Sequence, residues 1–168
     1  GGSADWLLVE STYGNRSHPK DSEVELRNLI KDTVAQRSCL IIPAFAIGRT
    51  QELIYTIRKM EDSGEIPAIP VHVDSPMGIE ATDIYCRHIE EHDFEMRQLR
   101  NQESCPISSQ HMVVDRTPEQ SKAISTLIGA LIIISASGRA SGGRVLHHLK
   151  HRLPNADTTV LLAGYQAE

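Results

Sequence analysis

Glu10 stands at a position in this chain where a carboxylate could take part in chemistry. It follows an apolar run, residues 6–9, and precedes Ser11 and Thr12. We interpret the run as a buried strand, and the carboxyl end of a parallel strand is a common place for catalytic acids. A single acid needs a histidine or a metal-bound water to orient before it can act on a phosphodiester. Because the chain contains no HxHxDH sequence, it does not supply that partner in a recognisable motif.

A glycine-rich stretch, ASGRASGGR at residues 136–144, follows a second apolar run and opens a predicted helix. Glycines allow close approach of the backbone to a ligand, and the free amides at a helix start attract anions. We interpret Gly142, Gly143 and Arg144 as a phosphate cradle, in which the arginine adds a charge-assisted contact. A tight turn with serine caps explains the spacing equally well. The glycines form neither GxGxxG nor a Walker A loop, which disfavours a dinucleotide fold.

A second stretch, FAIGRTQE at residues 45–52, has the same strand-to-helix arrangement. Arg49 lies at the opening of its predicted helix, where the helix dipole disfavours a cation. A ligand anion or a carboxylate partner would explain this arginine, and a solvated side chain is the simpler alternative. Tyr13 is a candidate for stacking on a base, although aromatic residues make up only 4% of the chain.

The remaining candidates have weaker signals. His147 and His151 lie four residues apart and could share a metal, but no third ligand is near in the sequence, so we favour a polar helix face with one half-buried ring. Asp74 ends a predicted strand, and we favour a helix-capping role for it over a ligand contact. His18, in the loop after the first motif, is a weak candidate for an RNA contact.

These candidates require an alternation of strands and helices. We predict strands at residues 6–11, 39–45, 70–75, 111–115, 130–137 and 158–164, mostly as continuous apolar runs, which indicate parallel strands covered on both faces. Helices are predicted from a Ser22/Glu25 capping box, at residues 49–61 and 77–90, from a Thr117/Gln120 capping box, and at residues 143–153. The expected fold class is α/β: a three-layer, Rossmann-like open sheet, mostly parallel, with about six strands and helices on both faces. Ligands would then gather at the carboxyl ends of the strands.

Composition restricts the partners. A net charge of −5 and a pI near 5.9 exclude a uniformly basic groove, so a polyanion would be held by a local patch or by backbone amides. No apolar run is long enough to cross a bilayer, and we expect no membrane partner. Three widely spaced cysteines do not form a disulfide framework, and they favour a reducing, cytoplasmic location with Cys39 in the core. We set residues 1–3 aside as an artificial leader and treat residues 4–168 as one domain.

Five blocks of sequence, in order, resemble the β-CASP domain of RNA-processing metallo-β-lactamase nucleases, and together they cover nearly the whole chain. The blocks are ADWLLVESTYGNRSH, IPAFAIGRTQELI, VDSPMGIEAT, IIISASGRASGGRVLHHLKHRLPN and TVLLAGYQAE. The resemblance implies a domain inserted into a metallo-β-lactamase domain of the same polypeptide, with the two closing over RNA. It also implies two zinc ions on the lactamase side, with their ligands before residue 1 and after residue 168.

The resemblance also implies roles for individual residues. Glu10 corresponds to the first acidic motif of the family and would orient a histidine outside this chain. The residues expected to hold the RNA backbone are Thr12, Tyr13, Arg49, Gly142, Gly143 and Arg144. Arg139 stands where many relatives have methionine, which would either add a charge at the RNA rim or only show that this position is exposed.

The function implied is that of an RNA-clamping lid of a zinc-dependent ribonuclease, inactive as an isolated chain and without a metal site of its own. The intact protein is also expected to be able to form a homodimer. The alternative is a non-catalytic α/β module that binds phosphate, a nucleotide or another protein. An HxHxDH motif in the adjoining sequence of the intact gene product would favour the nuclease.

Overall fold

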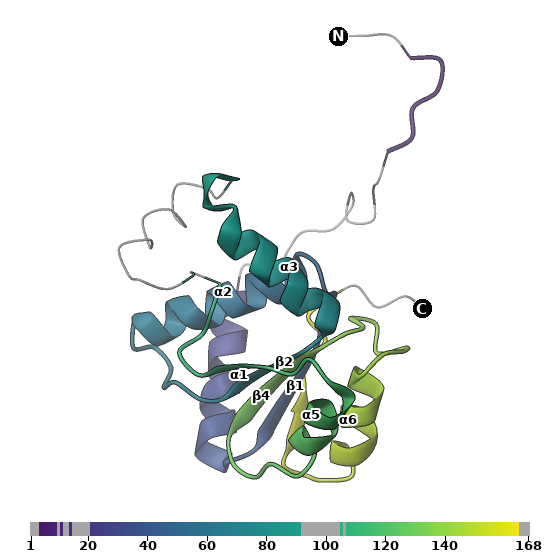
Figure 1. Ribbon diagram of the computed structural model, residues 1–168. Coiled ribbons are helices and arrows are strands. Elements are labelled where there is room, and N and C mark those ends of the chain that lie inside the picture. Colours follow the sequence, from purple (N-terminus) through teal and green to yellow (C-terminus); the bar gives the residue numbers. More distant parts are fainter. Residues whose placement is uncertain are drawn as a thin grey trace.

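The computed structural model describes residues 4–9, 11, 14, 21–91, 105 and 107–164. Five strands form one sheet in the order β3-β2-β4-β1-β5, and every pairing in it is parallel. The strands are β1 (Cys39–Pro43), β2 (Val71–Asp74), β3 (Met112–Val114), β4 (Leu131–Ser135) and β5 (Thr158–Val160). The helices are α1 (Ser22–Gln36), α2 (Arg49–Asp62), α3 (Pro76–Arg87), α5 (Pro118–Ile124) and α6 (Val145–Arg152), with a short 3₁₀ helix, η1 (Ile89–Glu91). The predicted α/β class, with a parallel sheet and helices on both faces, is confirmed (Figure 1).

The sheet separates two apolar cores because successive side chains of a strand point to opposite faces. Leu40 and Ile42 of β1 pack in the larger core, with residues of α1, α2 and α3. Ile41, between them, packs in the smaller core with Ile124 of α5 and Val145 of α6. The continuous apolar runs of the sequence are therefore explained by burial on both faces. None of the helices in the described part of the chain is long and apolar enough to cross a membrane.

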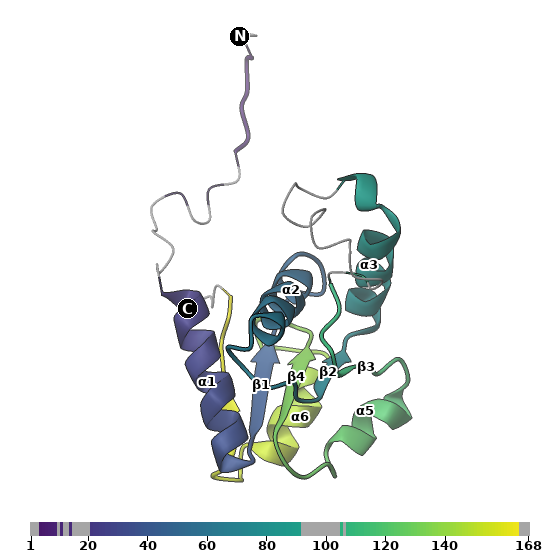
Figure 2. The ribbon, with the colours of Figure 1, turned by 90° about the vertical axis from the view of Figure 1, so that its left-hand side faces the viewer.

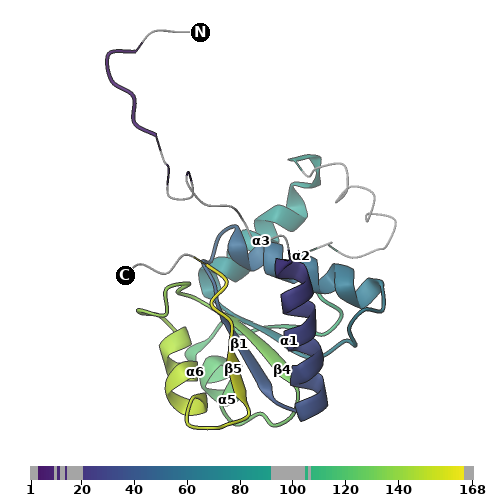
Figure 3. The same ribbon diagram turned by 180° about the vertical axis from the view of Figure 1, so that it is seen from behind.

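The chain changes direction between the neighbouring strands β1 and β4. After β1 it crosses β4 through α2 to reach β2, and after β4 it crosses β1 through α6 to reach β5. Helices α2 and α6 cover opposite faces, as Figures 2 and 3 show. In open parallel sheets a reversal of this kind leaves a crevice at the carboxyl ends of the two strands, where ligands bind.

Helix starts follow the sequence signals in part. Thr117 and Gln120 form the predicted capping box: the Gln120 amide donates to Thr117 Oγ1 (3.2 Å), and the Thr117 amide donates to Gln120 Oε1 (2.9 Å). The predicted capping box of Ser22 and Glu25 is wrong. Helix α1 begins at Ser22 itself, so the cap is Asp21, whose side chain makes no capping hydrogen bond.

The predicted first strand is absent from the described residues. Residues 6–9 have no strand pairing and extend away from the folded body (Figure 1). Their apolar side chains are exposed, with Trp6 at 91% and Leu8 at 98%. A strand needs a hydrogen-bonding neighbour, and the sheet that this chain forms by itself does not provide one for this segment. Glu10 lies outside the described residues.

Two cysteines that the sequence left unpaired form a disulfide. Cys86, near the end of α3, is bonded to Cys105 with a Cα–Cα separation of 5.5 Å. The number and spacing of the cysteines, read as excluding a disulfide framework, did not reveal this bond, and they no longer support the predicted cytoplasmic location. Cys39 is buried in the core as predicted, and burial raises the pKa of its thiol to about 11.

Candidate nucleic-acid interface

Two loops meet at the carboxyl ends of β1 and β4, where the chain direction reverses. Residues 44–48 connect β1 to α2, and residues 136–144 connect β4 to α6. Phe45 and Gly138 are in contact: a Cβ on Gly138 would lie 2.9 Å from the Phe45 nitrogen and 3.0 Å from its Cδ2. Only glycine allows the loops to approach this closely. The structure thus brings together the two stretches that the sequence identified as anion-binding candidates, and we call this pair of loops the rim.

The two predicted phosphate-binding glycines differ in their constraints. Gly143 has φ +78°, and a Cβ there would lie 2.5 Å from the Ala136 carbonyl oxygen. That carbonyl also accepts a hydrogen bond from the Val145 amide (3.1 Å). A Cβ on Gly142 would meet no atom within 4 Å, and the Gly142 carbonyl accepts from the Ser137 amide (3.2 Å). Gly143 is therefore required by the turn itself, whereas the space beside Gly142 is open to a ligand.

Asp74 joins the glycine turn at residues 136–144 to helices α5 and α6. Its side chain is completely buried. One carboxylate oxygen accepts from Ser121 Oγ (2.6 Å) and contacts His148 Nε2 (2.6 Å), and the other accepts from Arg144 Nη1 (2.7 Å). Burial raises the pKa of Asp74, but these three hydrogen bonds outweigh burial and lower it below its usual value. The ionised carboxylate therefore holds α5, α6 and the glycine turn against the end of β2.

The capping role that the sequence favoured for Asp74 is wrong. The N-cap of α3 is the next residue, Ser75, whose Oγ accepts from the Gly78 amide (3.2 Å). The predicted polar helix face with one half-buried histidine is also corrected. His148 is fully buried, and its Nε2 contacts the carboxylate of Asp74. These two residues are 74 positions apart in the sequence. Their pairing depends on the sheet topology, and no local pattern could have found it.

Arg144, predicted to contact phosphate, has several partners within the domain. Besides Asp74, its guanidinium donates to the carbonyls of Asp115 (2.8 Å) and Arg116 (2.9 Å). The side chain remains 23% exposed. These contacts assign Arg144 an anchoring role at the start of α6, and its contact with RNA stays a prediction.

Arg49, at the start of α2, has the carboxylate partner that the sequence offered as one explanation. Its Nη1 lies 2.8 Å from Glu52 Oε2 in an i,i+3 pair, and both side chains are partly or largely exposed. A surface pair of this kind is worth about 0–1 kcal/mol. A phosphate arriving at the rim would therefore displace Glu52 at little cost.

Gln51 is a rim residue that the sequence analysis missed. Its Oε1 accepts from the Gly48 amide (2.7 Å), and its Nε2 lies within 3.0–3.1 Å of Ala46 O, Gly78 O and Thr82 Oγ1. This buried amide links the β1–α2 loop to α3. Gln51 lies three residues after Gly48 at the start of a helix. This spacing is that of a capping box, and it could have predicted the contact between the Gly48 amide and Gln51 Oε1.

The histidines of α6 do not form a metal site. The rings of His147 and His151 have centroids 4.4 Å apart. In the described residues, no three His, Cys, Asp or Glu side chains are grouped so as to hold an ion. The zinc ions implied by the sequence resemblance therefore do not fit the residues described in this domain, and we derive no step through them.

Four candidates, Glu10, Thr12, Tyr13 and His18, lie outside the described residues. Their roles stay predictions. The rim that can be described therefore consists of the two loops and the residues that anchor them.

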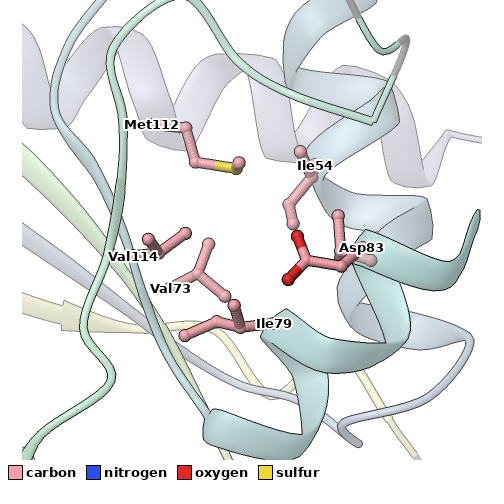
Figure 4. A pocket seen from close by; sticks show the side chains of 7 residues that line it. Ile54, Val73, Ile79, Asp83, Met112 and Val114 are labelled. Carbon is pink, nitrogen blue, oxygen red and sulfur yellow. The ribbon is translucent and has the colours of Figure 1, made fainter. Parts of the chain in front are cut away.

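A pocket elsewhere in the fold is a poor candidate for an anion site. It lies between α2, α3, β2 and β3 and is lined mostly by apolar side chains, among them Ile54 and Met112 (Figure 4). Its cavity volume of about 20 Å³ holds no more than about one water molecule and is far below the range of roughly 300–1,000 Å³ that is usual for ligand sites. The acid at its wall, Asp83, is paired with Arg116 (2.9 Å) and would repel a phosphate.

The parallel open sheet, with two glycine-containing loops at its reversal point, defines a Rossmann-like α/β domain. Residues 50–168 match the Beta-Casp domain, and the chain belongs to this family. It is 32% identical over 167 residues to Ribonuclease TTHA0252 of Thermus thermophilus, covering 98% of this chain and 38% of the relative. It is also 32% identical to transcription termination factor FttA of Methanosarcina mazei (96% and 26%) and to an RNase J-like protein of Methanocaldococcus jannaschii (98% and 38%). The chain thus spans about a quarter to two fifths of the length of these relatives.

Proposed function

We propose that this chain is the RNA-holding half of a β-CASP ribonuclease that hydrolyses phosphodiester bonds. Family membership and relatives named as ribonucleases support the proposal. The observation that carries it is the meeting of residues 44–48 and 136–144 at the reversal point of the sheet. Loops at such a point are suited to hold phosphate through backbone amides and arginine.

In this proposal the rim binds the RNA backbone and does not read its bases. Arg49 and the amides beside Gly142 and Gly143 contact phosphate oxygens. Arg144 keeps the turn in place, and the exposed part of its side chain faces the bound RNA. Contacts of this type position RNA without regard to sequence. Thr12 and Tyr13 extend the same surface, and Glu10 orients a histidine outside this chain.

The rest of the active site is assigned to a metallo-β-lactamase domain of the same polypeptide. The relatives are much longer than this chain, which leaves room for such a domain in an intact protein of similar length. The two zinc ions belong to that domain, and none of the residues described here is given a role as their ligand. The exposed apolar side chains of residues 6–9 support an adjoining domain that would cover them.

The test compares RNA binding and RNA hydrolysis. By itself the chain should bind single-stranded RNA but hydrolyse none, with or without added zinc, whereas the intact polypeptide should hydrolyse it. Arg49→Ala should weaken binding, measured by fluorescence anisotropy, about threefold to tenfold, as expected for a charge-assisted contact. Arg58→Ala is the matched control, because Arg58 makes an i,i+4 ion pair with Asp62 near the other end of α2.

Two outcomes would contradict the proposal. Equal loss of RNA affinity in the Arg49 and Arg58 variants would remove the rim as the binding site. Absence of RNA hydrolysis by the zinc-loaded intact polypeptide, with binding retained, would favour the alternative of a non-catalytic phosphate- or nucleotide-binding module.

A further inference from the structure

The charges of this acidic chain are strongly segregated. Residues 120–156 contain five of its 17 Lys and Arg side chains and none of its 22 Asp and Glu side chains. This stretch therefore carries +5 in a chain of net charge −5, and the other residues carry −10. It also contains three of the eight histidines. The fold places the stretch in the end of α5, in β4, in the glycine turn and in α6.

Two of the five cations hold the fold together. Arg144 is paired with Asp74, and Arg152 is buried and donates to the carbonyls of Ile124 and Leu127 at the end of α5. With Asp74, which contacts both helices, they keep α5 and α6 side by side on one face of the sheet, as Figures 1 and 3 show.

The other cations lie on the outside of this helix pair. Lys122 on α5, Arg139 at the glycine turn and Lys150 on α6 are exposed, and none has a carboxylate partner among the ion pairs of the described residues. His147 and His151 lie beside Lys150 on α6, with their rings in contact. We call these five residues the α5–α6 basic face.

His147 is exposed to the like charges of its neighbours on the basic face. Burial lowers the pKa of His147, and the charges of His151, His148 and Lys122 lower it further. Of the acids, buried Asp74 raises the pKa of His147, and Glu119, at the start of α5, interacts with Lys122 and Arg144. A gathering of like charges with one acid at its margin is unfavourable in the free protein, and a polyanion bound across it would relieve the repulsion.

The basic face continues directly from the rim. Helix α6 begins at Val145, two residues after Gly143, and carries the face away from the turn. Its eight residues span about 12 Å. This length allows contact with a few successive phosphates of a single strand.

We propose that the α5–α6 basic face is a track for the backbone of single-stranded RNA running outward from the rim. The inference rests on the proposed function, because the rim is where the strand begins. Continuity with the glycine turn favours RNA over an acidic protein segment as the occupant. The contacts are to phosphate, so the track lengthens the binding site without adding sequence preference.

The experiment measures affinity for two RNAs, one of about four nucleotides, which fills the rim alone, and one of about twelve, which also reaches the track. The test variant is Lys122→Glu with Lys150→Glu. The matched control is Lys31→Glu with Lys59→Glu, which makes the same charge change on exposed residues of α1 and α2. Circular dichroism and urea unfolding establish that both variants are folded, and a Lys122→Gln, Lys150→Gln variant repeats the test without charge reversal.

We expect the test variant to bind the longer RNA about tenfold more weakly, with the shorter RNA unaffected. The slope of log K against log salt for the longer RNA should become shallower by about 1.4, as expected for two lost phosphate contacts to a single strand. The control pair should change neither the length dependence nor the slope.

The proposal would be overturned if the test variant lost equal affinity for both RNAs. It would also be overturned if the test and control variants lost equal affinity for the longer RNA. The proposal would also be overturned if polyglutamate competed for the wild-type protein as effectively as RNA of the same length does. That result would indicate an acidic protein partner. If the wild-type protein binds neither RNA, the proposed function fails and the track fails with it, an outcome recognisable without any variant.

Discussion

The Nε2 atom of His148 and the Oδ2 atom of Asp74 lie 2.6 Å apart, and neither side chain has exposed surface. The pair connects the first turns of α6 to the end of β2, two elements on different sides of the reversal point. Arg144 and Ser121 complete the contacts of the same carboxylate. The position of the glycine turn in the rim therefore depends on one buried acid.

Replacing this acid should be costly. We expect Asp74→Asn to lower the free energy of unfolding by about 3 kcal/mol, because it removes the charge that compensates the Arg144 guanidinium and disturbs the hydrogen bonds of a buried carboxylate. Urea unfolding measures the difference. Asp83→Asn is the control: the ion pair of Asp83 with Arg116 is about half exposed, so this change should cost no more than about 1 kcal/mol. Similar losses of unfolding free energy in both variants would show that the buried Asp74 contributes no more to stability than an exposed ion pair.

The same pair predicts a pH dependence. Because the pKa of Asp74 is lowered in the folded protein, its contribution to stability is complete above the unfolded-state pKa of about 3.9 and is lost as pH falls through the lower folded value. The stability difference between the wild type and Asp74→Asn should thus be constant above about pH 5 and shrink below about pH 4. Urea unfolding at a series of pH values tests this, and a difference that grows toward acid pH would refute it.

The two glycines of the turn provide a matched pair of variants. Gly143→Ala places a Cβ 2.5 Å from a carbonyl oxygen at a positive φ and should destabilise the protein by at least about 2 kcal/mol. Gly142→Ala meets no neighbouring atom and should be close to neutral in stability. If phosphate occupies the space beside Gly142, this second variant should nevertheless weaken RNA binding. Anisotropy and urea unfolding separate the two effects, and unchanged RNA affinity would argue against phosphate at that position.

Gln51 should prove essential to the shape of the β1–α2 loop. Gln51→Glu keeps the size of the side chain, but a carboxylate cannot donate to the acceptors that surround Nε2. We expect a loss of about 2–4 kcal/mol in unfolding free energy, together with weaker RNA binding. Glu52→Gln, on the exposed side of the same turn, should leave stability within about 0.5 kcal/mol. A stable Gln51→Glu variant with normal RNA affinity would show that the loop needs no such anchor.

His147 should make stability depend on pH near neutrality. Its folded-state pKa is lowered, so the unfolded chain binds this proton more readily, and stability should decline as pH falls through the unfolded value of about 6.5. His147→Gln should remove this part of the decline, and His151→Gln should reduce it, because the charge of His151 contributes to the shift. Thermal melts between about pH 5 and 8 measure the effect. Identical pH profiles for the wild type and His147→Gln would contradict the prediction.

Local patterns predicted most of the secondary structure. The apolar run that became β4 and the Thr117–Gln120 box that starts α5 are signals within a few residues, and both were read correctly. Residues 6–9 show where the same reasoning fails. Their composition predicts a strand as clearly as that of β4, but a strand also needs a neighbour, and composition does not say whether the chain provides one.

The sequence by itself determined the parallel α/β class and the two loop motifs of the rim, because apolar runs and glycine spacing are properties of neighbouring residues, and its resemblance over five blocks indicated the family. Only the tertiary structure decided that Phe45 touches Gly138, that Asp74 pairs with His148 and that Cys86 bonds to Cys105. Each of these contacts joins residues 19 to 93 positions apart. Such pairings are set by the order in which strands lie in the sheet, which depends on the free energy of packing the whole chain.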